Sequence, residues 1–226
     1  MAKPISIAID GPAGAGKSTI AKRLAKELGF YYVDTGAIYR TVAYFMDLLG
    51  IAPKDTDGVN RYIDELTIEI EYDDEGLQHM IMNGMDVSLD IRTQDISQKA
   101  SLVSAQPVVR EMLLDMQRDV ARKHNVIMDG RDIGTVVLPK ADVKIFLTAS
   151  AEVRAQRRYA ELQAKGAKDS FEKVLADMKL RDHQDSTRAI APLKQARDAV
   201  LVDTSELDID GVVDAIHTIV KQKVSL

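Results

Sequence analysis

A glycine-rich stretch that ends in a lysine and two hydroxyl side chains carries the clearest chemical signal in the sequence. It consists of Gly11, Pro12, Ala13, Gly14, Ala15, Gly16, Lys17, Ser18 and Thr19, and it fits the phosphate-binding pattern G-x-x-x-x-G-K-[ST]. Glycines allow backbone N–H groups to converge on phosphate oxygens at a helix N-terminus, where the helix dipole favours anions. The pattern predicts that Lys17 reaches the β- and γ-phosphates of a nucleoside triphosphate and that the Ser18 hydroxyl binds Mg²⁺.

The residues on either side supply the structural context that this pattern requires. Residues 5–9 form an apolar run that ends at Asp10 and predicts a short buried strand. Residues 20–28 predict a helix that stops at Gly29. The alternative is an ordinary strand-to-helix turn that happens to contain glycines, and the correct flanks disfavour it.

The composition limits the classes of protein to which the chain can belong. With 226 residues, 46% of them apolar and 29% charged, it suits one globular domain with insertions or with a small satellite. A net charge of −5 disfavours a nucleic-acid polymer as partner, and the lack of cysteine excludes disulfides and thiolate chemistry. No apolar run approaches the length of a membrane span, and the N-terminus does not resemble a signal peptide. We therefore expect a soluble cytoplasmic protein, and nothing in the sequence demands more than a monomer.

The rest of the chain alternates predicted strands with predicted helices. The five predicted core strands cover residues 5–10, 30–33, 126–129, 143–148 and 199–203. The predicted helices cover residues 20–28, 37–49, 93–105, 108–123, 151–165, 169–184 and 208–222. This order favours the α/β class, with a five-stranded parallel sheet flanked by helices and joined by right-handed crossovers. In such a sheet the site lies at the carboxyl ends of the strands, where the glycine-rich loop, Asp34 and Asp129 all fall.

Residues 62–92 interrupt the alternation and predict a small antiparallel sheet inserted into the α/β chain. Residues 67–72 and 78–82 alternate in polarity with period two, and Asn83-Gly84 is a strong hairpin signal that leads into residues 85–89. We expect this insertion to cover a site rather than to build the core.

The charged side chains favour phosphoryl transfer between two anionic small molecules. The sequence lacks the Asn-Lys-x-Asp motif that reads guanine, which disfavours a switch GTPase. Several arginines follow core strands or lie in the polar helical pair 151–184, where they can offset charge repulsion between two substrates and help to exclude water. A phosphate-monoester acceptor is largely ionised near neutral pH, so positioning, Mg²⁺ and positive charge suffice without a general base.

Six stretches of the sequence together form a pattern more specific than the glycine-rich loop alone. They are Gly11 to Thr19, Asp34 to Arg40, Ile91 to Thr93, Asp129 to Val137, Arg181 to Arg188 and Ala191 to Leu193. The set resembles the bacterial cytidylate kinase family in its long form, over essentially the whole chain. The resemblance implies a P-loop NTPase fold in which ATP, bound with Mg²⁺, phosphorylates CMP or dCMP by direct in-line transfer.

The resemblance also implies a division of the chain into functional segments. The core would comprise residues 1–61, 106–153 and 189–226. The insertion 62–105 would be the monophosphate-binding domain, and residues 154–188 would be a LID that closes over ATP. The expected partners are small-molecule substrates alone.

Roles for individual side chains follow from the same resemblance. Those expected at the acceptor nucleotide are Thr35, Arg40 and Arg131 at its phosphate, Ser101, Arg110, Asp132 and Arg188 at the cytosine or its readers, and Arg181 and Asp185 at the sugar. Those expected to act on the transferred phosphate are Lys17, Arg131, Arg157 and Arg158, with the choice between the two LID arginines left open. Asp129 is expected beside hydrated Mg²⁺, together with Ser18.

The choice of base has a physical basis, and several alternatives stay open. Cytosine presents an amino donor that suits the Asp132 carboxylate, whereas uracil would place an oxygen opposite it. The alternative activities are those of another small-molecule kinase, for uridylate, adenylate or shikimate, and of a non-catalytic module switched by bound nucleotide. Asp10 and Asp34 could be purely structural, and Arg154, Arg157 and Arg158 could form a solvated helix face.

Overall fold

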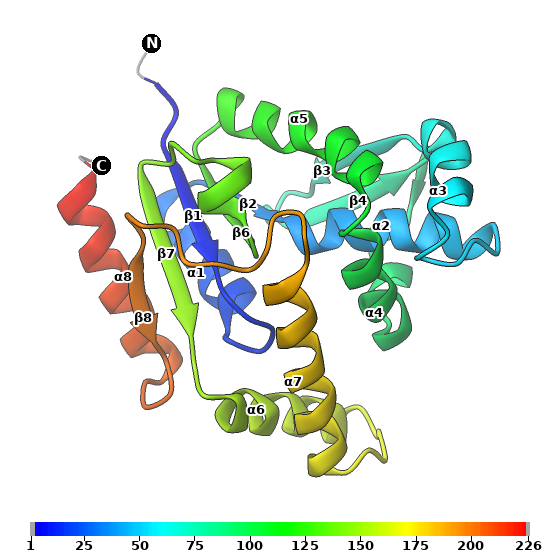
Figure 1. Cartoon of the computed structure of the whole chain (residues 1–226). Helices are drawn as coiled ribbons and strands as arrows, with labels where there is room; N and C mark the ends of the chain where they lie inside the picture. The colour runs from blue at the N-terminus through cyan, green and yellow to red at the C-terminus, as the bar shows by residue number, and fades with distance from the viewer. Residues whose placement is uncertain (1–2, 225–226) are drawn as a thin grey trace.

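A five-stranded parallel sheet lies at the centre of the structure, a computed structural model that describes residues 3–224 (Figure 1). Its strands are β1 (Ser6–Asp10), β2 (Tyr31–Asp34), β6 (Val126–Gly130), β7 (Val143–Thr148) and β8 (Val200–Asp203), in the spatial order β2-β6-β1-β7-β8. All neighbouring strands are parallel, so the predicted class and the five predicted strands are confirmed. The predicted core segments 1–61 and 189–226 include four residues that lie outside the described range, namely residues 1, 2, 225 and 226.

Apolar side chains alternate between the two faces of this sheet and build one core on each face. On β1, Ile7 and Ile9 point into one core, and Ala8 points into the other. The helices on the first face are α1 (Lys17–Leu28) and α8 (Ile209–Lys223), and those on the second are α2 (Thr35–Leu48) and α5 (Pro107–Lys123). Helix α4 (Gln94–Val103) packs against α2 and extends the second core away from the sheet. Every residue of β1 is buried, as expected for the central strand of a parallel sheet.

A three-stranded antiparallel sheet occupies the predicted insertion. Its strands are β3 (Ile68–Tyr72), β4 (Gln78–Met82) and β5 (Met85–Asp86), preceded by α3 (Thr56–Tyr62) and the short turn η1 (Ile63–Glu65) and followed by η2 (Asp90–Arg92). Asn83 and Gly84 have φ angles of 48° and 81°, the left-handed pair that a two-residue hairpin requires. Helix α3 was not predicted, because it has 7 residues and buries only Val59.

Two side chains of the small sheet attach it to β2, an edge strand of the parallel sheet. The Tyr72 hydroxyl donates to the backbone oxygen of Tyr32 at 2.9 Å, and Gln78 Oε1 accepts from the backbone N–H of Asp34 at 2.7 Å. The Asp34 carboxylate in turn accepts from the N–H of Ala37 at 2.9 Å and caps α2, which therefore begins at Thr35 rather than at Ala37. The insertion is thus fixed beside the carboxyl end of β2.

Helices α6 (Ala151–Ala164) and α7 (Phe171–Thr187) form a hairpin that projects beyond the sheet (Figure 1). The hydroxyl groups of Ser150 and Ser170 cap the two helices by accepting from backbone N–H groups at 3.2 Å and 3.3 Å. The connection turns at Gly166, which has a φ angle of 78°. Like every helix within residues 3–224, neither combines the length and apolar character that crossing a membrane requires.

Candidate active site

The glycine-rich loop connects β1 to α1 at the carboxyl edge of the parallel sheet, as the sequence predicted. Gly11 lies so close to β7 that a Cβ atom there would be 1.9 Å from the backbone oxygen of Leu147. Gly16 has a φ angle of 89° where α1 begins. The path of the loop therefore depends on glycine at these two positions.

Lys17 lies inside this loop with its ammonium group buried. Its Nζ donates to the backbone oxygen of Pro12 at 2.7 Å, and 6% of the residue is exposed. Burial lowers the pKa of Lys17 to about 7, and the positive charge of Arg131 is the next cause. Negative charge bound in the loop would raise this pKa again, so the site suits a polyphosphate.

Ser18 and Asp129 lie together beneath the loop. The Ser18 hydroxyl donates to Asp129 Oδ2 at 2.9 Å, and the Tyr32 hydroxyl donates to Asp129 Oδ1 at 2.9 Å. Burial raises the pKa of Asp129 to about 6, and the nearby Asp34 carboxylate adds to the effect. No group of three or more metal-ligating side chains exists within residues 3–224. A hydroxyl and a carboxylate oxygen do fit Mg²⁺ that keeps its waters and the phosphates of its nucleotide.

A cavity of about 630 Å³ opens between the loop, α4 and the α6–α7 hairpin. Its lining includes Lys17 and Ser18 from the loop, Ser101 from α4, Arg158 from α6 and Arg181 from α7. Segments far apart in the sequence thus converge on one space, and that space is large enough for small-molecule substrates.

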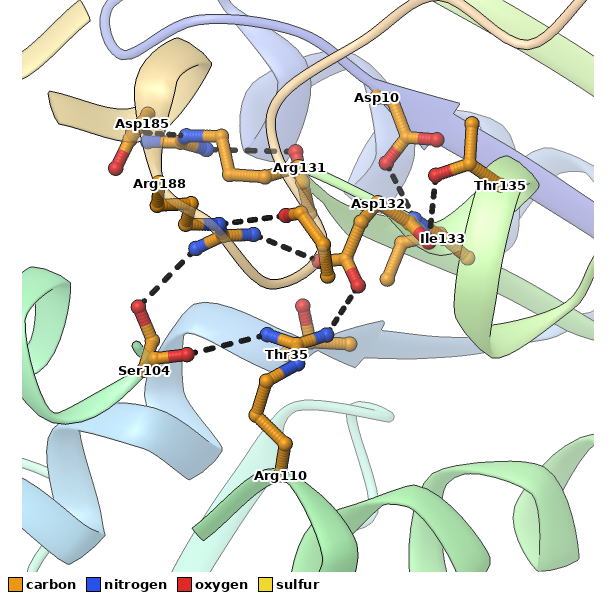
Figure 2. Close-up of polar contacts among 12 residues, drawn as sticks. Asp10, Thr35, Ser104, Arg110, Arg131, Asp132, Ile133, Thr135, Asp185 and Arg188 are labelled. Carbon is orange, nitrogen blue, oxygen red and sulfur yellow. Dashed lines mark hydrogen bonds and ion pairs between the residues drawn. The ribbon is translucent and has the colours of Figure 1, made fainter. Parts of the chain in front are cut away.

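One group of predicted acceptor residues centres on Asp185, near the end of α7. Arg131 Nε donates to Asp185 Oδ2 at 2.8 Å (Figure 2). The Ser101 hydroxyl donates to Asp185 Oδ1 at 3.0 Å. Arg181 is a second, half-buried cation beside this pair. Burial lowers the pKa of Arg181 to about 10, followed by repulsion from Arg131. Its buried Nε has no hydrogen-bond partner among the described residues.

Arg40 shows the same incomplete pairing on the opposite side of the site. One of its Nη groups donates to the Asp34 carboxylate at 2.9 Å, while its buried Nε has no partner within residues 3–224. Buried N–H groups are ordinarily paired, because an unpaired donor costs about 1–3 kcal/mol. The Nε groups of Arg40 and Arg181 are therefore two donors that remain open to an acceptor.

A second group of predicted acceptor residues centres on Asp132, which is 3% exposed. Its carboxylate lies between two guanidinium groups, those of Arg110 and Arg188, and the contact to Arg188 is 3.2 Å (Figure 2). Both arginines also bind Ser104. Arg110 donates to the backbone oxygen of Ser104 at 3.3 Å, and Arg188 donates to the Ser104 hydroxyl at 3.1 Å. The sequence did not predict Ser104, and no motif marks it. Ser101, which was grouped with these residues, lies on Asp185 instead.

The remaining predicted residues occupy separate positions. The Thr35 hydroxyl donates to the backbone oxygen of Asp129 at 2.7 Å. Arg158 lines the cavity and also pairs with Glu161 at 3.1 Å. Arg157 is not part of that lining, because it binds the backbone oxygen of Thr204 at 2.7 Å and its hydroxyl at 3.0 Å. The structure therefore brings one of the two LID arginines to the cavity.

Arg154 is a contact between the loop and the α6–α7 hairpin that sequence reasoning missed. It is 5% exposed, so the alternative of a solvated helix face is wrong for this residue. It donates to the backbone oxygens of Ala13 at 3.1 Å and Ala149 at 2.9 Å, and to the carboxylate of Asp182 at 2.7 Å. A charge run in the sequence gives no sign of this, since its arginines look alike.

Comparisons with known proteins agree with this geometry. A cytidylate kinase from Exiguobacterium sp. is 48% identical over 98% of this chain and 99% of its own length. A cytidylate kinase from Carboxydothermus hydrogenoformans is 50% identical over 96% of this chain and 97% of its own. A solved structure of an uncharacterized protein from Eubacterium ventriosum covers 97% of this chain and 99% of its own with a TM-score of 0.53, and its 15% identity supports the fold alone.

The family model for cytidylate kinase matches residues 7–222, which include the glycine-rich loop and both groups of predicted acceptor residues. The match extends over the core, the insertion and the α6–α7 hairpin alike, and the resemblance inferred from the motifs is confirmed. This chain belongs to the cytidylate kinase family.

Proposed function

We propose that this chain transfers the γ-phosphate of ATP to CMP or dCMP by direct in-line attack, giving ADP and CDP or dCDP. The observation that carries the proposal is the set of buried and half-buried cations around one cavity. Burial, followed by repulsion from Arg131, lowers the pKa of Lys17 on the donor side and of Arg181 on the acceptor side. Such mutual repulsion in the unliganded site favours the binding of two phosphorylated molecules.

On the donor side, the N–H groups of residues 11–19 bind the ATP phosphates, with Lys17 on the β- and γ-phosphates. Mg²⁺ bound with ATP neutralises phosphate charge. Ser18 and Asp129 are the residues that hold this ion, because they offer the oxygen ligands that it prefers and already lie 2.9 Å apart.

On the acceptor side, Arg40 and Arg131 bind the phosphate of CMP, and the Thr35 hydroxyl assists. We add Arg181, which the resemblance places at the sugar, to this phosphate because its Nε lacks a partner among the described residues. The two unpaired Nε groups of Arg40 and Arg181 support this role, since a phosphate oxygen would supply the hydrogen bonds that they lack. Asp185 holds Arg131 in place and binds the sugar. The acceptor phosphate is ionised near neutral pH, so its oxygen attacks without a general base.

Asp132, with Arg110 and Arg188, selects the base. Each carboxylate oxygen of Asp132 accepts from one arginine and keeps capacity for a further donor. The amino group of cytosine supplies that donor, whereas uracil would turn an oxygen toward the carboxylate and leave a buried group unpaired. We therefore expect CMP and dCMP to react faster than UMP.

Closure of the LID completes the site. Residues 62–105 form the monophosphate-binding domain beside a core of residues 1–61, 106–153 and 189–226, and the LID, residues 154–188, closes over ATP. Closure excludes the water that would otherwise hydrolyse ATP. One chain supplies every residue named here, so we expect the protein to act as a monomer, in the cytoplasm where ATP is available.

The direct test is ADP production from ATP and Mg²⁺ with CMP, dCMP, UMP, AMP, GMP or shikimate supplied singly. We expect fast turnover with CMP and with dCMP, and weak turnover with each of the other four acceptors. A preference for another acceptor would keep the donor-site roles and overturn the base-reading roles of Asp132, Arg110 and Arg188. ATP binding without acceptor-dependent turnover would contradict the proposed reaction and favour a nucleotide-switched module.

The two LID arginines provide a matched pair of variants. Arg158→Ala should lower kcat by about tenfold or more, because Arg158 lines the cavity and its charge can stabilise the transferred phosphate. Arg157→Ala should chiefly lower Tm, because Arg157 makes two hydrogen bonds to Thr204 and its loss removes both. Steady-state kinetics and thermal melts of both variants test this. A larger loss of kcat in Arg157→Ala would reverse the assignment.

Binding of ATP with Mg²⁺ should be accompanied by uptake of a proton at pH 8 and by release of a proton near pH 6. At pH 8 Lys17, with its pKa of about 7, is largely neutral, and bound phosphates raise that pKa, so binding takes up a proton. Near pH 6 Lys17 is largely charged, while Asp129, with its pKa of about 6, is partly protonated and releases its proton to the buffer when the cation binds. Titration calorimetry in buffers of different ionisation enthalpy measures both. Lys17→Arg, which is charged throughout, should abolish uptake at pH 8, and wild-type binding without uptake there would refute the linkage.

A further inference from the structure

The turn η3 (Ile133–Val137) directly follows Arg131 and Asp132 and determines where these two residues lie. It is a single wide helical turn, in which the N–H groups of Val136 and Val137 bind the backbone oxygen of Asp132 at 2.8 Å and 3.2 Å. One turn satisfies few of its own backbone groups, so its first N–H groups and its last carbonyl groups need partners from elsewhere. Both ends find such partners in charged side chains.

Asp10 closes the N-terminal end of this turn from the last position of β1. One carboxylate oxygen accepts from the N–H group of Ile133 at 2.7 Å (Figure 2). The other accepts from the N–H group of Gly134 at 2.7 Å. Asp10 is 4% exposed. A Cβ atom at Gly134 would lie 3.3 Å from Asp10 Oδ2 and 3.2 Å from Lys144 Cδ, so the turn packs closely against the carboxylate.

Arg118 closes the C-terminal end from the middle of α5. Its Nε donates to the backbone oxygen of Val137 at 2.9 Å, and its Nη2 donates to that of Val136 at 3.0 Å. A negative side chain at the N-terminal end and a positive one at the C-terminal end also complement the dipole of the turn. The backbone of the turn is therefore held at both ends by side chains of β1 and α5.

This arrangement leaves the Asp132 carboxylate available for the acceptor site. Asp132 is the N-cap residue of the turn, a position at which an aspartate ordinarily accepts from the N–H groups that follow it. Here Asp132 makes no such bond, because Asp10 already occupies two of these N–H groups. Both Asp132 oxygens consequently face Arg110 and Arg188. Arg110 and Arg118 lie about two helical turns apart on α5, so one helix holds both Asp132 and the turn behind it.

We infer that Asp10 and Arg118 are positioning residues, which clamp the turn Ile133–Val137 so that Arg131 and Asp132 are presented to the acceptor nucleotide. The inference rests on the proposed function, since it assumes that these two residues bind the acceptor. Neither clamp residue touches substrate. Their loss should weaken the acceptor side of the site and spare the donor side, although Asp10 directly precedes the glycine-rich loop.

The test compares Arg118→Gln with Arg122→Gln, a control on an exposed arginine one turn further along α5. In the full-length protein, Arg118→Gln should raise the Kd for CMP, measured by titration calorimetry without ATP, by about tenfold, since two charge-assisted bonds are weakened. The KM for ATP should stay within about twofold, and the preference for CMP over UMP should narrow. Arg118→Lys, which keeps a cationic donor, should restore part of the loss. Asp10→Asn, which keeps one acceptor oxygen, should show the same acceptor-specific pattern.

The other outcomes show whether the clamp alone fails or the proposed function fails as well. Wild-type turnover with CMP, together with identical CMP binding in Arg118→Gln and Arg122→Gln, would overturn the clamp alone. An equal loss of CMP and ATP affinity together with a lowered Tm would also overturn it, because that pattern means general destabilisation. Wild-type preference for another nucleoside monophosphate would redirect the same comparison to that acceptor. No acceptor-dependent turnover in the wild type would overturn the proposed function and the clamp with it.

Discussion

Replacing Lys17 with methionine should lower kcat by about a thousandfold, because the variant loses the one buried ammonium group inside the phosphate-binding loop. Methionine has a similar length and fills the same space without charge. The Tm should not fall, because the replacement also removes a buried charge whose pKa burial has lowered to about 7. Initial rates with saturating ATP and CMP, together with thermal melts, measure both effects.

Lys26→Met is the matched control for this prediction. Lys26 is exposed in the last turn of the same helix, so its replacement should leave kcat and Tm unchanged. A Lys17→Met variant that keeps more than about a tenth of the wild-type kcat would contradict the role of Lys17 on the transferred phosphate.

Asp132→Ala should lower kcat/KM for CMP by more than about tenfold and narrow the preference for CMP over UMP. Two losses contribute to this effect. The amino group of cytosine loses the carboxylate that accepts its hydrogen bond, and the guanidinium groups of Arg110 and Arg188 lose the carboxylate that orients them. The free energy of unfolding should also fall by about 3 kcal/mol, since Arg110 remains as a buried charge without its partner. Kinetics with CMP and UMP, corrected for the folded fraction from denaturant titration, give both quantities.

Asp115→Ala serves as the control, because it removes an exposed carboxylate from α5. It should change neither selectivity nor stability. Unchanged kinetics in Asp132→Ala would exclude Asp132 as the base reader, and an equal loss with CMP and UMP would assign it to structure rather than to selection.

The elements of this fold could be predicted because their patterns are local. Runs such as residues 143–148 are apolar and bounded by polar residues, and the strand β7 has these bounds. The Asn83-Gly84 signal fixed the hairpin through backbone angles alone. The spatial order of the strands could not be predicted, because the residues of β2 carry no local signal that distinguishes β6 from β1 as the neighbouring strand.

The candidate site was predictable where a motif carries it and not where side chains meet across long distances in the chain. The loop 11–19 has its own signature. The contact of Arg154 with Ala13 depends on how α6 packs against the sheet, and the same holds for the choice between Arg157 and Arg158. Ser104 looks like any helix-terminal serine until Arg110 and Arg188 are placed beside it.

The attachment of the insertion to β2 has a consequence for the solubility of the protein. An edge strand exposes unpaired backbone groups that can recruit a strand from another molecule and begin aggregation. Tyr72 occupies the backbone oxygen of Tyr32, and Gln78 occupies the backbone N–H of Asp34 and approaches its oxygen at 3.4 Å. These groups lie on the side of β2 that faces away from β6, because alternate residues of a strand turn their backbone groups to the same side. The insertion therefore also shields one margin of the parallel sheet from pairing with other chains.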